Sequence, residues 1–407
     1  KGLGDWIVNF KKLPHGLSKL AEIANKNGMK FGLWFEPEMV NENSDLYRTH
    51  PEWAICVPKQ IPSLGRNQMV LDLGLLEVQD YIISSVSAIL DSAHIEYVKW
   101  DMNRHMSDFY SQRYNQGEFF HRYILGLYRV FEVLTKKYPA ILWESCSSGG
   151  NRNDLGMLCY MQQNWASDDT DAFERIQIQS GTAMAYPLSS IGAHLSASPS
   201  HQVLRKTPID TRFNVAAFGN LGFELDLKKL SFVDTAAIRR GIDFYKEHRH
   251  LLQYGHFYQM KTMQEDGYAV WMVLSDDRKE GMFGYFQGLG KSNPSIDILQ
   301  GINLIDIAVY RVTARHQETN LKTFGGLINM VSPVKVNEDG RLVDFISKHK
   351  TLEGLLKKSY DETYDAFGDA FNNGAIKLEP QWAGTGFDEH VRVMADFGSR
   401  MYYFKVK

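Results

Sequence analysis

Short apolar segments alternate with helical segments over residues 1–254, which predicts an α/β fold: a (β/α)8 TIM barrel followed by an antiparallel β domain. The apolar segments are nearly continuous, as expected for parallel strands that helices cover on the outside. Polar residues gather after the strands rather than before them, and such a barrel carries its active site at the carboxyl ends of its strands. A doubly wound open sheet is the structural alternative, but the chain has no GxGxxG loop to hold a nucleotide.

About seven strands are expected before residue 230, and helices connect them. The strands are expected at 30–35, 69–73, 97–101, 141–144, 158–165, 188–193 and 218–225. The helices are expected at 17–26, 76–90, 119–138, from 170 through 178, and at 235–254. The chain opens at Lys1 without an initiator methionine, and we expect the first strand of the barrel to be missing from it.

Residues 255–407 are expected to form a C-terminal β-sandwich domain, because the sequence pattern changes after Tyr254. Residues 268–274 and 281–287 alternate between apolar and polar side chains on either side of a polar turn, which is the pattern of a β-hairpin. A helical insertion is expected near 342–371.

Composition excludes several classes of protein. The net charge of -3 gives no electrostatic reason to expect nucleic acid or an acidic membrane surface as a partner. No segment approaches the roughly 18 apolar residues of a membrane helix. The three cysteines are too few for a disulfide scaffold and fit a cytoplasmic protein. The 13 histidines form no HExxH motif, so a metal site has little support.

The segment Tyr97–Arg104 contains the main candidate for a reacting group. Residues two apart on a strand share a face, so Lys99, Asp101 and Asn103 would converge on one small polar ligand, with Asp101 as the candidate nucleophile. The structural alternative is an ordinary strand end with a solvated aspartate.

A second carboxylate, Asp168, follows another expected strand within the segment Trp165–Asp171. Aspartates here also have a plain use as helix caps. Two carboxylates on separate strand ends are what a glycosidase needs, because one attacks the anomeric carbon and the other protonates the leaving oxygen. A partly buried site beside Trp165 would raise the pKa of the acid.

The turn Glu144–Arg152 contains small residues, and Gly149 among them would let the backbone approach a ligand closely. A phosphate-binding turn is the alternative, although no GK[ST] follows. Considered alone, Cys146 is a small buried residue and Arg66 a surface residue.

Two other classes of function stay open. A metal-dependent barrel enzyme would use oxygen ligands from Glu36, Glu38, Asp72 and Asp101. A sugar-binding protein without catalytic activity would bind galactose but would not hydrolyse a galactoside.

Four segments, in this order, resemble the α-galactosidases of glycoside hydrolase family 36, and the resemblance continues through residues 381–400. The segments are KFGLWFEPEMV at 30–40, YVKWDMNR at 97–104, WESCSSGGNR at 143–152 and WASDDTDA at 165–172. The resemblance implies a retaining exo-α-galactosidase that acts on melibiose- and raffinose-type oligosaccharides. An α-N-acetylgalactosaminidase and a galactosyl-transferring enzyme of the raffinose-synthase type are the nearest alternatives.

The resemblance also implies roles for single residues: Asp101 matches the nucleophile and Asp168 the acid/base. It implies that no cofactor is used and that the protein is a homo-oligomer, a tetramer. Members of the family begin with a β-sandwich and a first barrel strand that these 407 residues lack, so we expect little activity from the chain by itself. The positions that match contacts to galactose in the family are Trp34, Arg66, Lys99, Asn103, Cys146 and Gly149.

Overall fold

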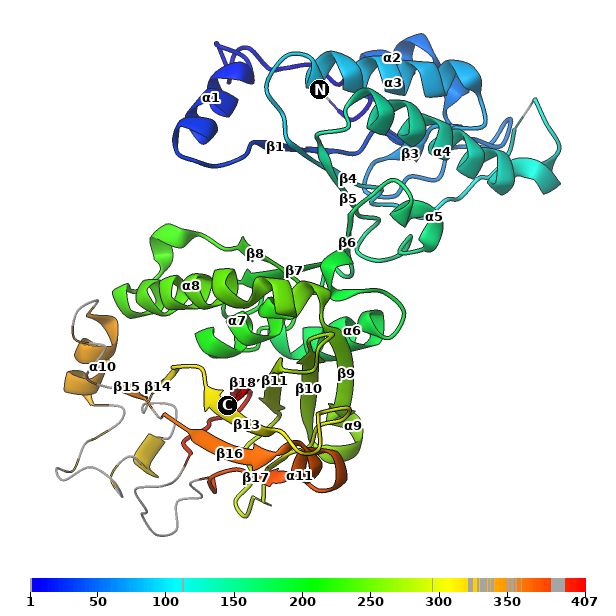
Figure 1. Cartoon of the computed structure of the whole chain (residues 1–407). Helices are drawn as coiled ribbons and strands as arrows, with labels where there is room; N and C mark the ends of the chain where they lie inside the picture. Colours follow the sequence, from blue (N-terminus) through cyan, green and yellow to red (C-terminus); the bar gives the residue numbers. More distant parts are fainter. Residues whose placement is uncertain are drawn as a thin grey trace. The chain divides into compact units, whose positions relative to one another are not determined.

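The computed structural model in Figure 1 consists of two compact units, residues 1–168 and residues 169–407, and each unit is described by itself. The described residues are 2–407 except for 112, 295, 321–324, 328, 330–334, 336, 338–339, 350–351, 353–354, 356, 360 and 382–391.

The first unit contains a parallel sheet of four strands in the order β1-β4-β5-β6. Helices lie between these strands in the chain, as the alternation predicts. The elements are α1 (Ser18–Lys26), β1 (Gly32–Phe35), β2 (Met39–Val40), α2 (Asp45–Thr49), β3 (Met69–Val70), α3 (Leu76–Leu90), β4 (Tyr97–Trp100), α4 (Phe119–Lys137), β5 (Leu142–Ser145), α5 (Leu155–Leu158) and β6 (Gln163–Trp165).

Helices α3 and α4 pack against each other, and their buried faces follow helical spacing. Val78, Ile82 and Val86 lie on the buried face of α3, and Leu127 and Val130 on that of α4. These side chains share one core cluster with Val98 and Trp100 of β4, so the helices fix the strand that ends at Asp101.

The strand predicted at 69–73 forms, but it does not join the parallel sheet. Strand β3 pairs antiparallel with β2 instead. It follows a tight turn in which Arg66 and Asn67 have positive φ values of 55° and 60°, and Gly65 and Gln68 exchange backbone hydrogen bonds. Residues 41–68 connect β2 to β3, so the antiparallel partners of this segment come from earlier parts of the chain: β2 and, through an isolated bridge to Leu71, Ala54.

The second unit begins with two parallel strands, β7 and β8, and three helices. The structure therefore describes six of the seven predicted strands as parallel, four in the first unit and two here. The elements are α6 (Ala172–Ala183), β7 (Ile191–Ser196), α7 (Ile209–Ala217), β8 (Asn220–Glu224) and α8 (Phe232–Tyr254).

Helix α7, in which every residue is buried, was not predicted from the sequence. Its buried residues include the polar side chains of Asp210, Arg212 and Asn214, so apolar residues do not recur at helical spacing along it.

The remaining part of the second unit is built on a six-stranded sheet in the order β16-β13-β18-β11-β10-β9, with two small two-stranded sheets. Neighbouring strands in the larger sheet run antiparallel, as predicted. The elements are β9 (His256–Lys261), α9 (Met263–Asp266), β10 (Tyr268–Leu274), β11 (Glu280–Gln287), β12 (Ile298–Leu299), β13 (Val309–Ala314), β14 (Glu318–Asn320), α10 (Arg341–Lys348), β15 (Lys357–Ser359), β16 (Thr363–Phe367), α11 (Gly368–Asn373), β17 (Ile376–Lys377) and β18 (Ser399–Val406).

The structure differs from the helical insertion expected near 342–371. Helices α10 and α11 lie at the two ends of this range, but strand β16 lies between them and pairs with β13. Its side chains alternate between exposed and partly buried, which is a strand period rather than a helical one. The domain boundary expected between 254 and 255 stays a prediction; it falls between the end of α8 and the start of β9.

Candidate active site

Asp101 lies directly after β4 and is only 6% exposed. Its backbone N–H donates to the carbonyl of Phe35 in the neighbouring strand at 2.8 Å. Its Oδ2 accepts a hydrogen bond from Trp34 Nε1 at 2.9 Å, and its Oδ1 accepts one from the backbone N–H of Met102 at 2.9 Å. The carboxylate is therefore held in a fixed orientation by donors that carry no charge.

Trp34, Lys99, Glu144 and Gln163 occupy one row across the parallel strands β1, β4, β5 and β6. Residues in register on adjacent strands point to the same face of a sheet, so their side chains meet. Lys99 Nζ lies 2.9 Å from Glu144 Oε1 and 4.6 Å from the centroid of the Trp165 ring. Burial lowers the pKa of Lys99, but the carboxylates of Glu144 and Asp101 outweigh it and leave this pKa above its ordinary value. Lys99 is therefore a cation in the site.

Asn103 lies two residues beyond Asp101, and its backbone N–H donates to Glu36 Oε1 at 2.7 Å. Burial raises the pKa of Glu36, and hydrogen bonds from Asn103 oppose this only in part. The positive charge of Arg66 also acts on Glu36, although Arg66 itself is exposed in its turn. Asn103 and Arg66 thus gather around Glu36, close to Asp101.

Cys146 follows β5, and its backbone N–H donates to the carbonyl of Trp100 at 2.8 Å. Burial, followed by the neighbouring Asp101 carboxylate, raises the pKa of the Cys146 thiol to about 12. The thiol therefore keeps its proton and donates it in a hydrogen bond to Asp101. Cys146 is buried, as predicted from the sequence. Its contact with Asp101 was not predicted.

Gly149 has a φ of 85°, and its backbone lies against the segment that carries Asp168. A Cβ atom at position 149 would lie 2.7 Å from the Cα of Ser167 and 2.9 Å from the backbone nitrogen of Asp168. Asp168 itself is exposed and accepts a hydrogen bond from Trp165 Nε1 at 3.1 Å. The glycine turn after β5 therefore positions the acidic segment after β6.

Beneath these groups, the fully buried Glu38 connects three parts of the first unit. Trp100 Nε1 donates to its Oε1 at 2.8 Å, and the Tyr123 hydroxyl donates to its Oε2 at 2.6 Å. Arg152, at the end of the glycine turn, donates to both carboxylate oxygens at 2.9 and 3.0 Å. Glu38 thus binds the strand before Asp101 to the turn that contains Gly149.

The four acids of the metal alternative do not form one ligand set. Glu38 is paired with Arg152, while Asp72 accepts hydrogen bonds from the Tyr114 hydroxyl at 2.5 Å and the Gly74 N–H at 2.9 Å. Within the described part of the chain, no group of three or more His, Cys, Asp or Glu side chains has the arrangement of a metal site.

All eight predicted site residues lie in the first unit, and contacts link them into a connected group. Trp34 and Cys146 contact Asp101, Lys99 lies over the ring that binds Asp168, and Gly149 packs behind Asp168. Glu144 was not predicted as the partner of Lys99, although it lies at the end of a predicted strand, as Asp101 does.

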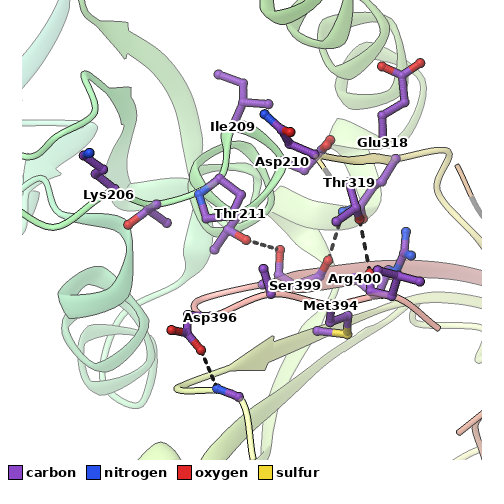
Figure 2. Close-up of a pocket in the computed structure, with 18 of the residues that line it drawn as sticks. Lys206, Ile209, Asp210, Thr211, Glu318, Thr319, Met394, Asp396, Ser399 and Arg400 are labelled. Atoms are coloured by element: carbon purple, nitrogen blue, oxygen red, sulfur yellow. Dashed lines mark hydrogen bonds between the residues drawn. The ribbon is translucent and has the colours of Figure 1, made fainter. Parts of the chain in front are cut away.

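A separate cavity of about 800 Å³ lies in the second unit, between the start of α7, strand β14 and the segment that leads into β18 (Figure 2). Its acidic side chains are engaged by neighbours. Asp210 accepts from Arg315 Nη2 at 2.6 Å, and Asp396 accepts from the backbone N–H of Gly290 at 2.7 Å. None of the predicted site residues belongs to this cavity.

The melibiase family model matches residues 1–255. Alpha-galactosidase AgaA of Geobacillus stearothermophilus is 50% identical over 303 residues, which are 74% of this chain and 42% of that protein. Alpha-galactosidase 1 of Pediococcus pentosaceus is 46% identical over 297 residues, 72% of this chain and 40% of that protein. The chain therefore spans less than half the length of these two relatives.

Among solved structures, a GH36 α-galactosidase AgaA variant from Geobacillus stearothermophilus in complex with raffinose is similar over the whole chain. The TM-score is 0.82 at 40% sequence identity, and the match covers 100% of this chain and 49% of that one. The similarity confirms the fold class predicted from the sequence. No helix in the described residues combines the length and the apolar character needed to cross a membrane.

Proposed function

Because the chain belongs to the melibiase family, glycoside hydrolase family 36, we propose that this protein is a retaining exo-α-galactosidase. Its substrates in this proposal are melibiose- and raffinose-type oligosaccharides with a terminal α-linked galactose. The observation that carries the proposal is the setting of Asp101, a buried carboxylate at a strand end that accepts hydrogen bonds from neutral donors and lies beside the cation of Lys99.

In the first step, a carboxylate oxygen of Asp101 attacks the anomeric carbon of galactose, and the bond to the leaving oxygen breaks. Asp168 donates its proton to that oxygen, so the aglycone leaves as an alcohol. The product of this step is a galactosyl ester of Asp101.

In the second step, the Asp168 carboxylate removes a proton from water, and the water oxygen attacks the anomeric carbon. The ester bond to Asp101 breaks, and galactose leaves with its configuration retained because two inversions have occurred. The exposure of Asp168 fits a group that must meet both the leaving oxygen and a water molecule.

The other predicted residues bind the sugar in this proposal. Trp34 is 44% exposed, so its ring is available to pack against an apolar sugar face while its Nε1 orients Asp101. Lys99 and Cys146 supply donors beside Asp101, as the family resemblance implies. Arg66, Asn103 and Gly149 complete the proposed set.

The choice of substrate is supported by the AgaA variant, whose structure is a complex with raffinose. A homotetramer in the cytoplasm is the proposed state of the protein, from the family resemblance and the composition. Light scattering coupled to size-exclusion chromatography would measure the oligomer.

A panel of 4-nitrophenyl glycosides, assayed with the full-length protein, tests the proposal. We expect hydrolysis of the α-galactoside in preference to the α-N-acetylgalactosaminide and the β-galactoside. Proton NMR during the reaction should show α-galactose as the first product. Release of β-galactose first, or turnover of only the N-acetylated substrate, would contradict the proposal.

The proposed role of Asp168 has its own test. Asp168→Asn should slow raffinose hydrolysis by roughly 10²- to 10⁴-fold. The first step on 4-nitrophenyl α-galactoside should slow less, because nitrophenolate leaves without a proton. Equal losses on both substrates would rule out the acid role.

A further inference from the structure

We propose that Glu144 is a positioning residue of the active site, which fixes the ammonium group of Lys99 beside the Asp101 carboxylate. The inference rests on the proposed function, in which Lys99 contacts the sugar and Asp101 is the nucleophile. It assigns a role to a residue that makes no contact with Asp101 of its own.

The geometry fixes Glu144 from three sides. Strand register places it directly opposite Lys99, and its side chain is 4% exposed. One carboxylate oxygen, Oε1, faces Lys99 Nζ at 2.9 Å. The other, Oε2, accepts from Gln163 Nε2 at 2.7 Å and from the Tyr97 hydroxyl. Tyr97 on β4 and Gln163 on β6 therefore orient the Glu144 carboxylate, which in turn positions Lys99.

Lys99 is linked to both proposed reacting carboxylates. Its ammonium group lies over the Trp165 ring, and Trp165 Nε1 donates to Asp168. Its charge also interacts with Asp101 and Cys146. If Lys99 Nζ were free to rotate, its charge would move relative to both acids, and its hydrogen bonds to a sugar would lose their fixed direction.

Glu144 also balances the charge of Lys99. The charged and titratable groups that act on Lys99 are Glu144 from β5, Asp101 from its own strand and Cys146 beyond β5. Those around Asp101 are Lys99, Cys146, Glu36 and Arg152. Loss of the Glu144 charge leaves the Lys99 cation unbalanced beside Asp101, and this cation then holds the Asp101 carboxylate more strongly and makes it a weaker nucleophile.

Glu144→Gln tests the charge, because the amide keeps the size and can still accept from Lys99. We expect the pKa of Lys99 to fall, as measured by NMR titration of protein labelled with ¹³C at lysine Cε and assigned with Lys99→Arg. For 4-nitrophenyl α-galactoside, kcat should fall because the nucleophile is weaker, and KM should rise roughly tenfold.

Glu96→Gln is the matched control. Glu96 precedes β4 at the opposite end of the same strand and accepts from Asn25 Nδ2 at 2.9 Å. The substitution removes the same charge at the other end of the strand, and it should leave the Lys99 titration, kcat and KM as in the wild type.

Gln163→Leu separates orientation from charge, because it removes one donor to Glu144 and changes no charge. It should raise KM without moving the Lys99 titration. The proposal is overturned if the Lys99 titration in Glu144→Gln matches that of the wild type. If Glu144→Gln does not fold, an unchanged KM in Gln163→Leu overturns it. Failure of the full-length wild-type protein to hydrolyse any α-galactoside would instead overturn the proposed function, and the Lys99 titration would still test the contact between Lys99 and Glu144.

Discussion

Two buried acids, Asp101 at a strand end of the first unit and Asp210 beside the cavity of the second unit, are held in opposite ways. Asp101 accepts hydrogen bonds from an indole, a backbone amide and a thiol, all of them neutral. Asp210, beside the cavity in Figure 2, is paired with the guanidinium of Arg315 at 2.6 Å. A carboxylate held by neutral donors keeps its charge for a reaction, whereas one paired with arginine has that charge compensated inside the fold.

The comparison also shows that volume alone does not identify a site. The cavity of about 800 Å³ is lined by polar and apolar side chains from α7, β14 and the approach to β18. The predicted reacting groups lie elsewhere, on strand ends where register brings Trp34, Lys99 and Glu144 into one row. A reaction needs several functional side chains close together, and parallel strands bring such side chains together at their carboxyl ends.

The largest expected effect is loss of turnover in Asp101→Asn. The amide cannot form the glycosyl ester, so kcat for 4-nitrophenyl α-galactoside should fall by roughly 10⁴-fold or more. Because the amide is neutral and similar in size, the urea midpoint should change little. Asp91→Asn, an exposed position at the end of α3, is the control and should keep wild-type kcat. Turnover of Asp101→Asn near the wild-type rate would remove this residue from the mechanism.

Asp210→Asn should lower stability and leave kcat unchanged, which is the reverse of the effect expected for Asp101→Asn. It leaves the buried Arg315 without a counter-charge, which costs about 3 kcal/mol of unfolding free energy. The kcat per folded molecule should stay at the wild-type value, since the substitution lies outside the predicted site. Urea unfolding and initial rates measure the two quantities. If activity falls and stability does not, the contrast between the two regions is wrong.

Two glycines with positive φ provide the next comparison. Gly149→Ala brings a Cβ within 2.9 Å of the backbone at Asp168, so the acid segment must move and kcat should fall roughly 10²-fold. At Gly267, with a φ of 77°, a Cβ would meet only the flexible end of Lys291 at 3.4 Å. Gly267→Ala should therefore lower the unfolding free energy by about 1 kcal/mol and leave kcat unchanged. Equal kinetic losses in the two variants would show that backbone strain, and not the contact with residue 168, is responsible.

The smallest expected effect is a pH dependence of stability that arises from Glu36. Burial raises its folded-state pKa above the ordinary value of 4.5, so the folded protein binds this proton more tightly than the unfolded chain does. Its contribution to stability is therefore lost as the pH rises from about 4.5 through the folded-state pKa, by about 1.4 kcal/mol for each pH unit between the two values.

Glu36→Gln removes this dependence, so the variant should gain stability relative to the wild type between pH 4 and pH 8 in urea unfolding. Glu22→Gln is a control of opposite sign. Hydrogen bonds from Lys26 and Lys19 lower the pKa of Glu22 to about 2, so its contribution is present at neutral pH and lost on acidification. If the difference in unfolding free energy between Glu36→Gln and the wild type did not change with pH, Glu36 would not be buried as described.

Sequence alone was sufficient for the elements whose pattern is local. Helix α3 has the predicted bounds, and strands β4 and β5 lie within a residue or so of theirs, because apolar periodicity and adjacent polar residues mark them directly. The two candidate carboxylates were found in the same way, since a charged residue directly after an apolar strand stands out in the chain.

Only the tertiary structure decided which residues become partners. Strand register pairs Lys99 with Glu144 across 45 residues of chain, and the Gly149 turn reaches the backbone at Asp168 from another strand. It also placed β3 outside the parallel sheet and buried α7 on every side. The physical reason is common to these cases: periodicity reports how a segment faces its surroundings, whereas pairing depends on long-range contacts that no local pattern records.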